Sequence, residues 1–313
     1  MHGTWRYGQI SVPVSQNPCL TGSPLSHPVA GYGLPTGAGR WRLCRQRRRY
    51  QPGSGTAGGE IISQQSFTIA VSGKGGTGKT TVSSLIIRSF IESGKRPVLA
   101  VDADPNANLH EALGVEVHET LGSMREEAFT KNIPHGMSRH EYIKYRFRHA
   151  LVESDGFDLL AMGRPEGTGC YCFANDLLSE CMQQLGRQYQ FVVIDTEAGM
   201  EHISRGTIGR PDALLIVSDP GARGLRTVSR IRTIATSLGL APERIHSVLN
   251  RYKSGTATID IGGENPIAII PEDPEVEKAD LAAEPVSKIP FNSPARVAVR
   301  DLVEKLMAMV EKG

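Results

Sequence analysis

The chain has 313 residues, of which 39% are hydrophobic, enough to bury a core. Residues 1–65 hold seven Arg and one Glu, so residues 66–313 carry a net charge of −4 and lack the basic footprint of a nucleic-acid-binding protein. No apolar run reaches the length of about 18 residues that crosses a bilayer, and no secretory signal is visible. We therefore expect a cytoplasmic protein without a nucleic-acid or membrane partner.

The first 65 residues differ in composition from the rest of the chain. They contain eleven Gly and six Pro and show no lasting helical or strand periodicity. The basic run at residues 40–49 suits RNA or an anionic membrane, but a segment that buries so little apolar surface is more simply a disordered tail or a stretch translated from a wrongly chosen start codon. We expect the folded domain to span residues 66–313.

Within that domain, short apolar runs alternate with segments of helical spacing. This alternation predicts an α/β fold, a mostly parallel sheet with helices on both faces. Polar clusters follow the predicted strands, at the edge where such sheets bind ligands. Residues 110–147 are polar and partly helical, without elements that can be placed. The predicted strands are 67–71, 96–101, 157–162, 191–194, 213–217, 245–249 and 267–270, and the predicted helices are 80–92, 175–185, 225–238 and a C-terminal helix through 299–310.

A glycine-rich loop, GKGGTGKT, joins the first predicted strand to the first helix. Its spacing fits the Walker A motif, whose backbone N–H groups surround phosphates at a helix N-terminus. Lys79 is expected to reach the β- and γ-phosphates of ATP, and Thr80 to ligate Mg²⁺. The predicted phosphate site consists of Gly73, Lys74, Gly75, Gly76, Thr77, Gly78, Lys79, Thr80 and Thr81.

Besides Lys79, this loop contains a lysine at its start, Lys74, which bears on the class of ATPase. With it, the segment KGGTGKT resembles the deviant Walker A motif of the MinD, ParA and nitrogenase iron-protein group, and the resemblance covers about residues 66–310. It implies a P-loop ATPase that forms a homodimer around its nucleotides, in which Lys74 reaches the phosphates of the partner subunit. A solvated loop lysine is the alternative.

Further residues match this group one by one. Asp102 and Asp104 resemble its first switch: Asp102 would support Mg²⁺ or its water shell, and Asp104 would polarise the attacking water. Asp195 ends an apolar strand like the Walker B aspartate, although it could instead cap a helix, and residues 196–199 resemble the second switch. Lys74, Lys79 and Asp104 are thus the expected catalytic residues. The adenine-side loops of the group correspond to Asn250, Arg251, Pro271 and Asp273.

A Cys-x-Cys pair, Cys170 and Cys172, lies on a Gly- and Pro-rich loop after the third predicted strand. Five cysteines are too few for a disulfide framework, whereas two such loops meeting at a dimer axis would supply four thiolates to Zn²⁺ or Ni²⁺. Arg164 is close enough in sequence to help lower the thiol pKa. Two small loop residues, or a redox pair, remain the alternatives.

The stretches 162–172 and 197–202 resemble the CooC-type accessory ATPases, which serve nickel insertion into carbon monoxide dehydrogenase and the acetyl-CoA synthase complex. In that family the Cys-x-Cys pair binds nickel or zinc at the dimer interface. Glu201 and His202 would be a supporting part of the switch or a plain helix-surface pair. Cys181, in the helix 175–185, is expected to be a small buried residue.

These observations favour an ATP-hydrolysing metallochaperone that delivers nickel to carbon monoxide dehydrogenase or acetyl-CoA synthase. An iron–sulfur reductase is an alternative, but residues 195–202 hold no cysteine where the nitrogenase iron protein has one. A MinD- or ParA-type positioning ATPase is another. It requires a basic face or a basic amphipathic tail, whereas the C-terminal helix has charges of both signs around its apolar stripe, as a core-packing helix does.

Overall fold

The computed structural model describes a domain that lies wholly within one unit of the chain, Glu60–Gly313. The expected leader, 1–65, lies outside the described residues. So do residues 165–171, which include Cys170, and residues 200–207, which include Glu201 and His202. The described residues are 66–130, 133, 136–138, 141–142, 145–146, 150–164, 172–185, 188–199, 208–253 and 265–311.

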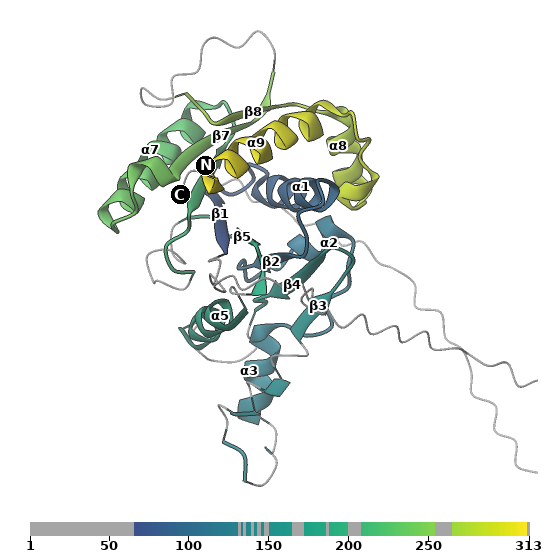
Figure 1. Cartoon of the computed structure of the whole chain (residues 1–313), viewed down its shortest axis with the longest axis vertical. Coiled ribbons are helices and arrows are strands. Elements are labelled where there is room, and N and C mark those ends of the chain that lie inside the picture. Colours follow the sequence, from purple (N-terminus) through teal and green to yellow (C-terminus); the bar gives the residue numbers. More distant parts are fainter. Residues whose placement is uncertain are drawn as a thin grey trace, which may run out of the picture. The chain divides into compact units, whose positions relative to one another are not determined.

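The described strands form one sheet in the order β3-β4-β2-β5-β1-β6-β7-β8 (Figure 1). All neighbours pair in parallel except β3, which runs antiparallel to β4 at one edge. The predicted α/β fold with a mostly parallel sheet is therefore confirmed. The strands are β1 Phe67–Gly73, β2 Val98–Asp102, β3 Leu151–Glu153, β4 Phe157–Ala161, β5 Phe191–Asp195, β6 Ala213–Ser218, β7 Ile245–Tyr252 and β8 Ala268–Pro271.

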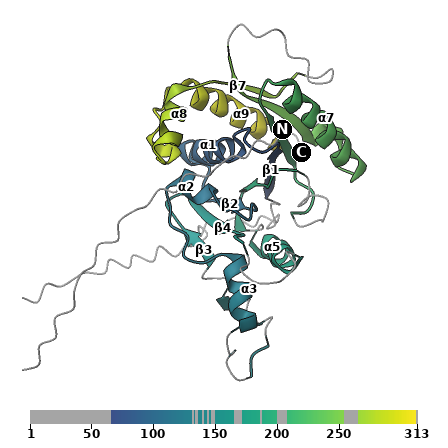
Figure 2. The same ribbon diagram turned by 180° about the vertical axis from the view of Figure 1, so that it is seen from behind.

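Helices cover both faces of this sheet (Figure 1 and Figure 2). Alternate strand residues enter two separate cores, so that Ala70 packs with α5 and α7 while Ile69 and Val71 pack with α1 and α9. Burial on both faces explains why the strands are continuous apolar runs instead of alternating ones. The helices are α1 Lys79–Glu92, α2 Leu109–Leu113, α3 Leu121–Thr130, α5 Cys172–Leu185, α7 Ala222–Ser237, α8 Pro274–Leu281 and α9 Pro294–Val310.

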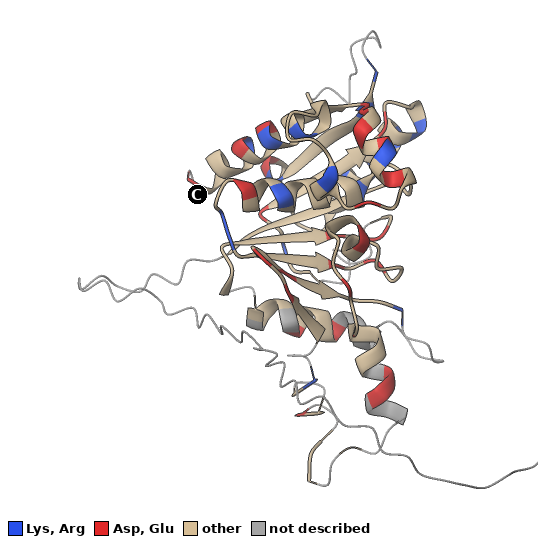
Figure 3. Cartoon of the chain, turned by 90° about the vertical axis from the view of Figure 1, so that its right-hand side faces the viewer, with Lys and Arg blue, Asp and Glu red and all other residues tan. Residues whose placement is uncertain are grey.

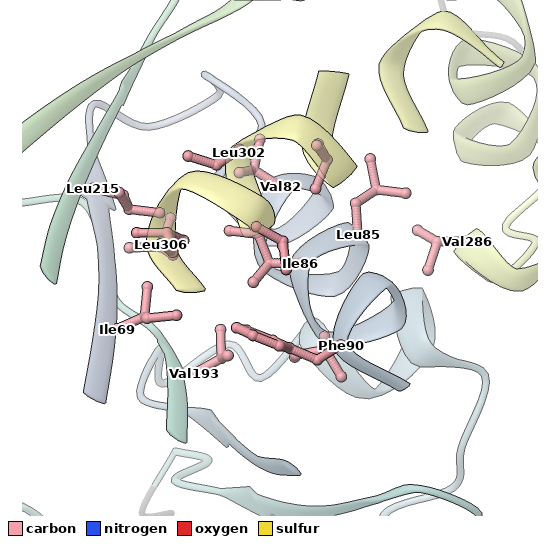
Figure 4. Close-up of a cluster of buried hydrophobic side chains, with 14 of the residues drawn as sticks. Ile69, Val82, Leu85, Ile86, Phe90, Val193, Leu215, Val286, Leu302 and Leu306 are labelled. Carbon is pink, nitrogen blue, oxygen red and sulfur yellow. The ribbon is translucent and has the colours of Figure 1, made fainter. Parts of the chain in front are cut away.

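The core beneath α1 and α9 contains the buried phenylalanines Phe90, Phe157 and Phe191. Figure 4 shows Ile86 of α1 between Phe90 and the α9 residues Leu302 and Leu306. The ring of Phe90 stacks on that of Phe191 in β5, with centroids 4.4 Å apart. The apolar stripe of α9 is thus buried against α1 and the sheet, as predicted for the C-terminal helix. Among the described helices, none is long and apolar enough to cross a membrane.

Several elements differ from the sequence prediction. The unplaced region contains α2 and α3, and β3 adds an antiparallel edge strand. Strand β7 continues to Tyr252, so Asn250 and Arg251 lie within it and not beyond its end. Helix α8 was missed, although Asp273 caps it and Pro274 occupies its first turn, a recognisable start signal.

We expect Leu302→Ala to lower the free energy of unfolding by about 2–5 kcal/mol, because a fully buried leucine would leave a cavity between α9 and the sheet. Chemical denaturation of the nucleotide-free protein measures this change. Leu281→Ala is the matched control: Leu281 is 82% exposed, and its truncation should stay within about 0.5 kcal/mol of the parent protein. Equal losses in both variants would contradict the assigned core.

Candidate functional site

The loop between β1 and α1 can be built only with glycine at its ends. Gly73 has φ 149°, and a Cβ atom there would lie 2.2 Å from the carbonyl oxygen of Val217 in β6. Gly78 has φ 86° and precedes the first helical residue, Lys79. The first N–H groups of α1, which have no intrahelical partner, therefore open into the loop. This is the anion-binding geometry that the motif predicts.

The loop lysines occupy different environments. Lys79 is only 9% exposed, and its Nζ lies 3.4 Å from the carbonyl oxygen of Lys74, which also accepts a 2.8 Å hydrogen bond from the Thr77 hydroxyl. The Lys74 side chain is exposed. A buried lysine inside the loop suits contact with phosphates of the same subunit. The predicted reach of Lys74 into a partner subunit needs an exposed side chain, and that role stays a prediction.

Hydroxyl groups of α1 hold the carboxylate of Asp195, the last residue of β5. Thr80 Oγ1 donates to Asp195 Oδ2 at 2.6 Å, and Ser83 Oγ donates to Oδ1 at 3.0 Å. Asp195 thus binds side chains within the site and not the N-terminus of a helix. A threonine hydroxyl beside a carboxylate provides the oxygen ligands that Mg²⁺ prefers. Ser83 was missed, although its place three residues after Thr80 puts it on the same helical face.

A second buried carboxylate lies beside this pair. Asp102 ends β2 in register with Asp195, and its oxygens accept from the N–H groups of Asp104 at 3.1 Å and Leu109 at 2.8 Å. Burial raises the pKa of Asp102 to about 7, and the negative charge of Asp195 adds to the rise. Burial also raises the pKa of Asp195 to about 6, opposed by the hydrogen bonds from Thr80 and Ser83 and by the charge of Lys79. Two buried carboxylates that resist ionisation fit a site completed by a divalent cation.

The two switch segments are tied to the ends of these strands. Asp104 Oδ1 accepts hydrogen bonds from the backbone and side chain of Asn106, at 2.8 and 3.0 Å. Thr196 donates to the carbonyl oxygen of Val71, and the Ser72 hydroxyl donates to the carbonyl oxygen of Gly199 at 2.6 Å. The second segment therefore borders the phosphate loop, and Asp104 of the first lies close enough to Asp195 for its charge to raise the pKa of that carboxyl. Figure 3 shows acidic segments beside the arrowheads of the strands, at this edge of the sheet.

A cavity of about 310 Å³ adjoins the loop on the side of β7 and β8. Asn250 Nδ2 donates to the carbonyl oxygen of Thr77 at 2.9 Å, and Arg251, which has φ 56°, donates to that of Gly76 at 3.2 Å. These contacts place Asn250 and Arg251, two of the four predicted adenine-side residues, against the phosphate loop. The wall of the cavity includes Thr81, Asn250, Arg251, Pro271, Asp273 and Leu281.

Asp273 has a structural part in addition to the predicted contact with the nucleotide, and that contact stays a prediction. Its carboxylate accepts hydrogen bonds from the Glu275 N–H at 3.0 Å, the Ser293 hydroxyl at 2.6 Å and the Ala295 N–H at 2.9 Å. It therefore joins the starts of α8 and α9, and these hydrogen bonds lower its pKa even though burial acts in the opposite direction. Its carboxylate shapes the cavity wall by fixing these helices, because its oxygens are already engaged.

The predicted cysteine site falls mostly outside the described residues. Cys170 lies among the undescribed positions, Cys172 is the first residue of α5, and Cys181 lies within the same helix. Within the described part of the chain, no three His, Cys, Asp or Glu side chains converge on a possible metal position. Binding of Ni²⁺ or Zn²⁺ by the Cys-x-Cys pair therefore stays a prediction, as does any part played by Glu201 and His202.

A glycine loop at a helix N-terminus, a hydroxyl–carboxylate pair for Mg²⁺ and an adjoining cavity define a P-loop ATPase. The model of the CobQ/CobB/MinD/ParA nucleotide binding domain matches residues 68–286, and the chain belongs to this family. Its relatives include an uncharacterised ATP-binding protein of Methanocaldococcus jannaschii, 40% identical over 248 residues that cover 76% of this chain and 98% of the relative.

Two further comparisons bear on function. The carbon monoxide dehydrogenase accessory protein CooC of Rhodospirillum rubrum is 34% identical over 210 residues, which cover 62% of this chain and 76% of that protein. The structure of the septum site-determining protein MinD of Pyrococcus horikoshii, complexed with Mg-ADP, aligns with a TM-score of 0.58 at 25% identity, covering 77% of this chain and 96% of that one. The chain is accordingly an ATPase of the MinD, ParA and CooC kind.

Ser83→Ala should slow ATP hydrolysis about tenfold and raise the Mg²⁺ concentration needed for half-maximal activity, because Asp195 loses a hydrogen bond to its charged form. Steady-state assays across a Mg²⁺ series measure both effects. Ser84→Ala is the control, since the Ser84 hydroxyl donates only to the Thr81 carbonyl within α1. The assignment fails if the two variants behave alike.

Asp102→Asn should remove a pH dependence of stability. Because the folded state raises the pKa of Asp102 from 3.8 to about 7, its contribution is fully present below pH 3.8 and is lost as pH rises through 7. The nucleotide-free protein should therefore lose stability between those values, by up to about 1.4 kcal/mol per pH unit for this one group. Denaturation curves across this range test the slope. Asp155→Asn, at a fully exposed side chain, should leave it unchanged.

Proposed function

We propose that the protein is an ATP-hydrolysing metallochaperone whose homodimer carries nickel to carbon monoxide dehydrogenase or the acetyl-CoA synthase complex. The observation that carries this proposal is the pair Cys170 and Cys172, at the end of the segment that joins β4 to α5, with Cys172 as the first residue of that helix. The similarity to a protein named as an accessory factor of carbon monoxide dehydrogenase supports it.

The start of this loop is attached to the first switch. Ala161, the last residue of β4, lies in register with Asp102, and the N–H group of Met162 donates to the Asp102 carbonyl at 2.8 Å. Arg164 Nη2 donates to Asn106 Oδ1 at 3.2 Å, and Asn106 in turn binds Asp104. A change at the nucleotide therefore has a short path of contacts to the beginning of the cysteine loop.

In this proposal, metal binding and nucleotide binding are linked because the two subunits share the thiolate ligands of one metal ion. Two thiolates from one subunit leave a four-coordinate cation incompletely bound, and the partner subunit provides the other two when the dimer closes around ATP. Nickel is then held in the closed dimer and released to the client when hydrolysis opens it. By thermodynamic linkage, each ligand must tighten the binding of the other.

A positioning ATPase is the second candidate, favoured by the similarity to MinD structures such as that of Pyrococcus furiosus, which aligns with a TM-score of 0.58 at 27% identity and covers 78% of this chain and 99% of that one. Membrane positioning needs an amphipathic helix with a free apolar face. In α9 the apolar side chains Val299, Leu302 and Leu306 are buried in the core. This packing makes the metallochaperone the preferred proposal.

Titration with Ni²⁺ or Zn²⁺, with and without a non-hydrolysable ATP analogue, tests the linkage. The analogue should raise both metal affinity and the dimer fraction about tenfold or more. Cys170→Ser/Cys172→Ser should abolish the gain in metal affinity while ATP still drives dimerisation, and Lys74→Ala should abolish both. Cys181→Ser is the matched cysteine control. Equal metal affinity and equal dimer fraction with and without the analogue would refute the mechanism.

The client is tested separately, by nickel activation of carbon monoxide dehydrogenase in cells. Activation should be lost with Lys79→Ala, which removes phosphate binding, and with Cys170→Ser, which removes a metal ligand. Unchanged activation in the cysteine variant would argue for the positioning ATPase.

A further inference from the structure

Helix α7 differs from the other long helices in its charge. It contains Arg223, Arg226, Arg230 and Arg232 and no acidic residue, whereas α1, α8 and α9 each carry charges of both signs. Figure 3 shows basic and acidic segments intermixed on the helices in view. An all-basic helix is unexpected in a domain whose net charge is −4.

Three of these arginines, Arg223, Arg226 and Arg230, are exposed and follow one another at intervals of three and four residues. That spacing places them along a single stripe of the helix. The opposite face consists of Gly224, Val228, Ile231 and Ala235, which are buried against the sheet. Within the described part of the protein, no ion pair or hydrogen bond engages any of the three guanidinium groups.

This arrangement does not serve the stability of the helix. Arg223 lies in the first turn, where the helix dipole favours acidic side chains, and the cap residue Gly221 supplies no side-chain hydrogen bond. Arg226 and Arg230 are like charges four residues apart, a spacing that destabilises helices. A binding partner with acidic groups would relieve this repulsion.

The same stripe continues with exposed apolar residues. Ile234 follows Arg230 by four residues and is 36% exposed, and Leu238, the cap residue, follows by four more and is 38% exposed. Arginines beside exposed aliphatic side chains are typical of protein–protein interfaces. Phosphate groups of nucleic acid would pair with the arginines but leave both aliphatic side chains in water.

Helix α7 is also joined to the nucleotide site through the strand before it. Three residues separate it from β6, whose Val217 pairs with Gly73. Its inner face packs on β6, β1 and β7, and it lies apart from α1, α8 and α9 in both ribbon views (Figure 1 and Figure 2). A protein bound to this helix leaves the nucleotide cavity free.

We propose that the outer face of α7, formed by Arg223, Arg226, Arg230, Ile234 and Leu238, is the docking surface for an acidic patch on a protein partner. In the proposed function, on which this step rests, that partner is the nickel enzyme that receives the metal. The arginines provide attraction and orientation, and the two aliphatic residues provide the buried centre of the contact.

The test compares two double charge reversals in the full chain. Arg226→Glu/Arg230→Glu should weaken binding of purified nickel carbon monoxide dehydrogenase about tenfold or more and reduce the dependence of Kd on salt. Lys278→Glu/Lys288→Glu, at exposed positions on the other face of the sheet, makes the same change in charge and should bind as the parent does. Ile234→Ser should weaken binding while its salt dependence stays unchanged.

Basal ATP hydrolysis and thermal unfolding of the α7 variants should match the parent, because positions 226, 230 and 234 are exposed and the double reversal keeps like charges four residues apart. Equal binding of the dehydrogenase by both double variants would overturn the inference. So would absence of binding by the parent, or an effect of the α7 reversals confined to duplex DNA or phosphatidylserine vesicles. Failure of the metallochaperone proposal is distinguishable, because it appears as unlinked Ni²⁺ and ATP binding regardless of α7.

Discussion

The hydrogen bonds from Thr80 and Ser83 to Asp195 are the interaction on which the site depends. They fix α1 across the carboxyl end of β5, and this sets the direction in which the phosphate loop opens. Asp195 can be held this way only because β5 lies between β1 and β2 in the sheet, flanked by the strand that enters the loop and the strand that ends at Asp102. Sheet order, more than any single contact, brings the two carboxylates together.

Burial makes the carboxyl groups of Asp102 and Asp195 harder to ionise. Neither has a cationic side chain as a direct hydrogen-bond partner among the described residues, and their raised pKa values express the free energy needed to hold two negative charges there. Mg²⁺ bound with a nucleotide would supply the missing positive charge. The nucleotide-free site is therefore electrostatically incomplete.

The sequence predicts those parts of the molecule whose physics is local. Buried parallel strands are recognisable as continuous apolar runs, and the phosphate loop is recognisable because Gly73 and Gly78 need conformations or close contacts that only glycine allows. Elements formed by tertiary packing were harder. Helix α3 is polar, β3 has three residues, and the extension of β7 through Asn250 depends on contacts with the phosphate loop.

Asp273 shows the same limit at the level of one residue. Its position after β8 matches an adenine-side loop, and its further role in joining two helices follows from Ser293 and Ala295, twenty or more residues further along the chain. Local spacing reveals an N-cap through the following proline. It does not reveal that one carboxylate joins two helices, because that contact exists only after α8 and α9 have docked.

Two segments of the chain begin at the nucleotide edge of the sheet. The segment after β4 begins beside Asp102 and is joined to Asn106 through Arg164, and α7 follows the strand that pairs with Gly73. Both α5, which follows the cysteine loop, and α7 pack into the core opposite α1. The face that carries α1, α8 and α9 surrounds the nucleotide cavity, which leaves the α5 and α7 face for exchange with other molecules. Under the proposed function, the helix that begins at Cys172 and the docking helix share this face, so that one nucleotide-driven change at the strand ends can act on both.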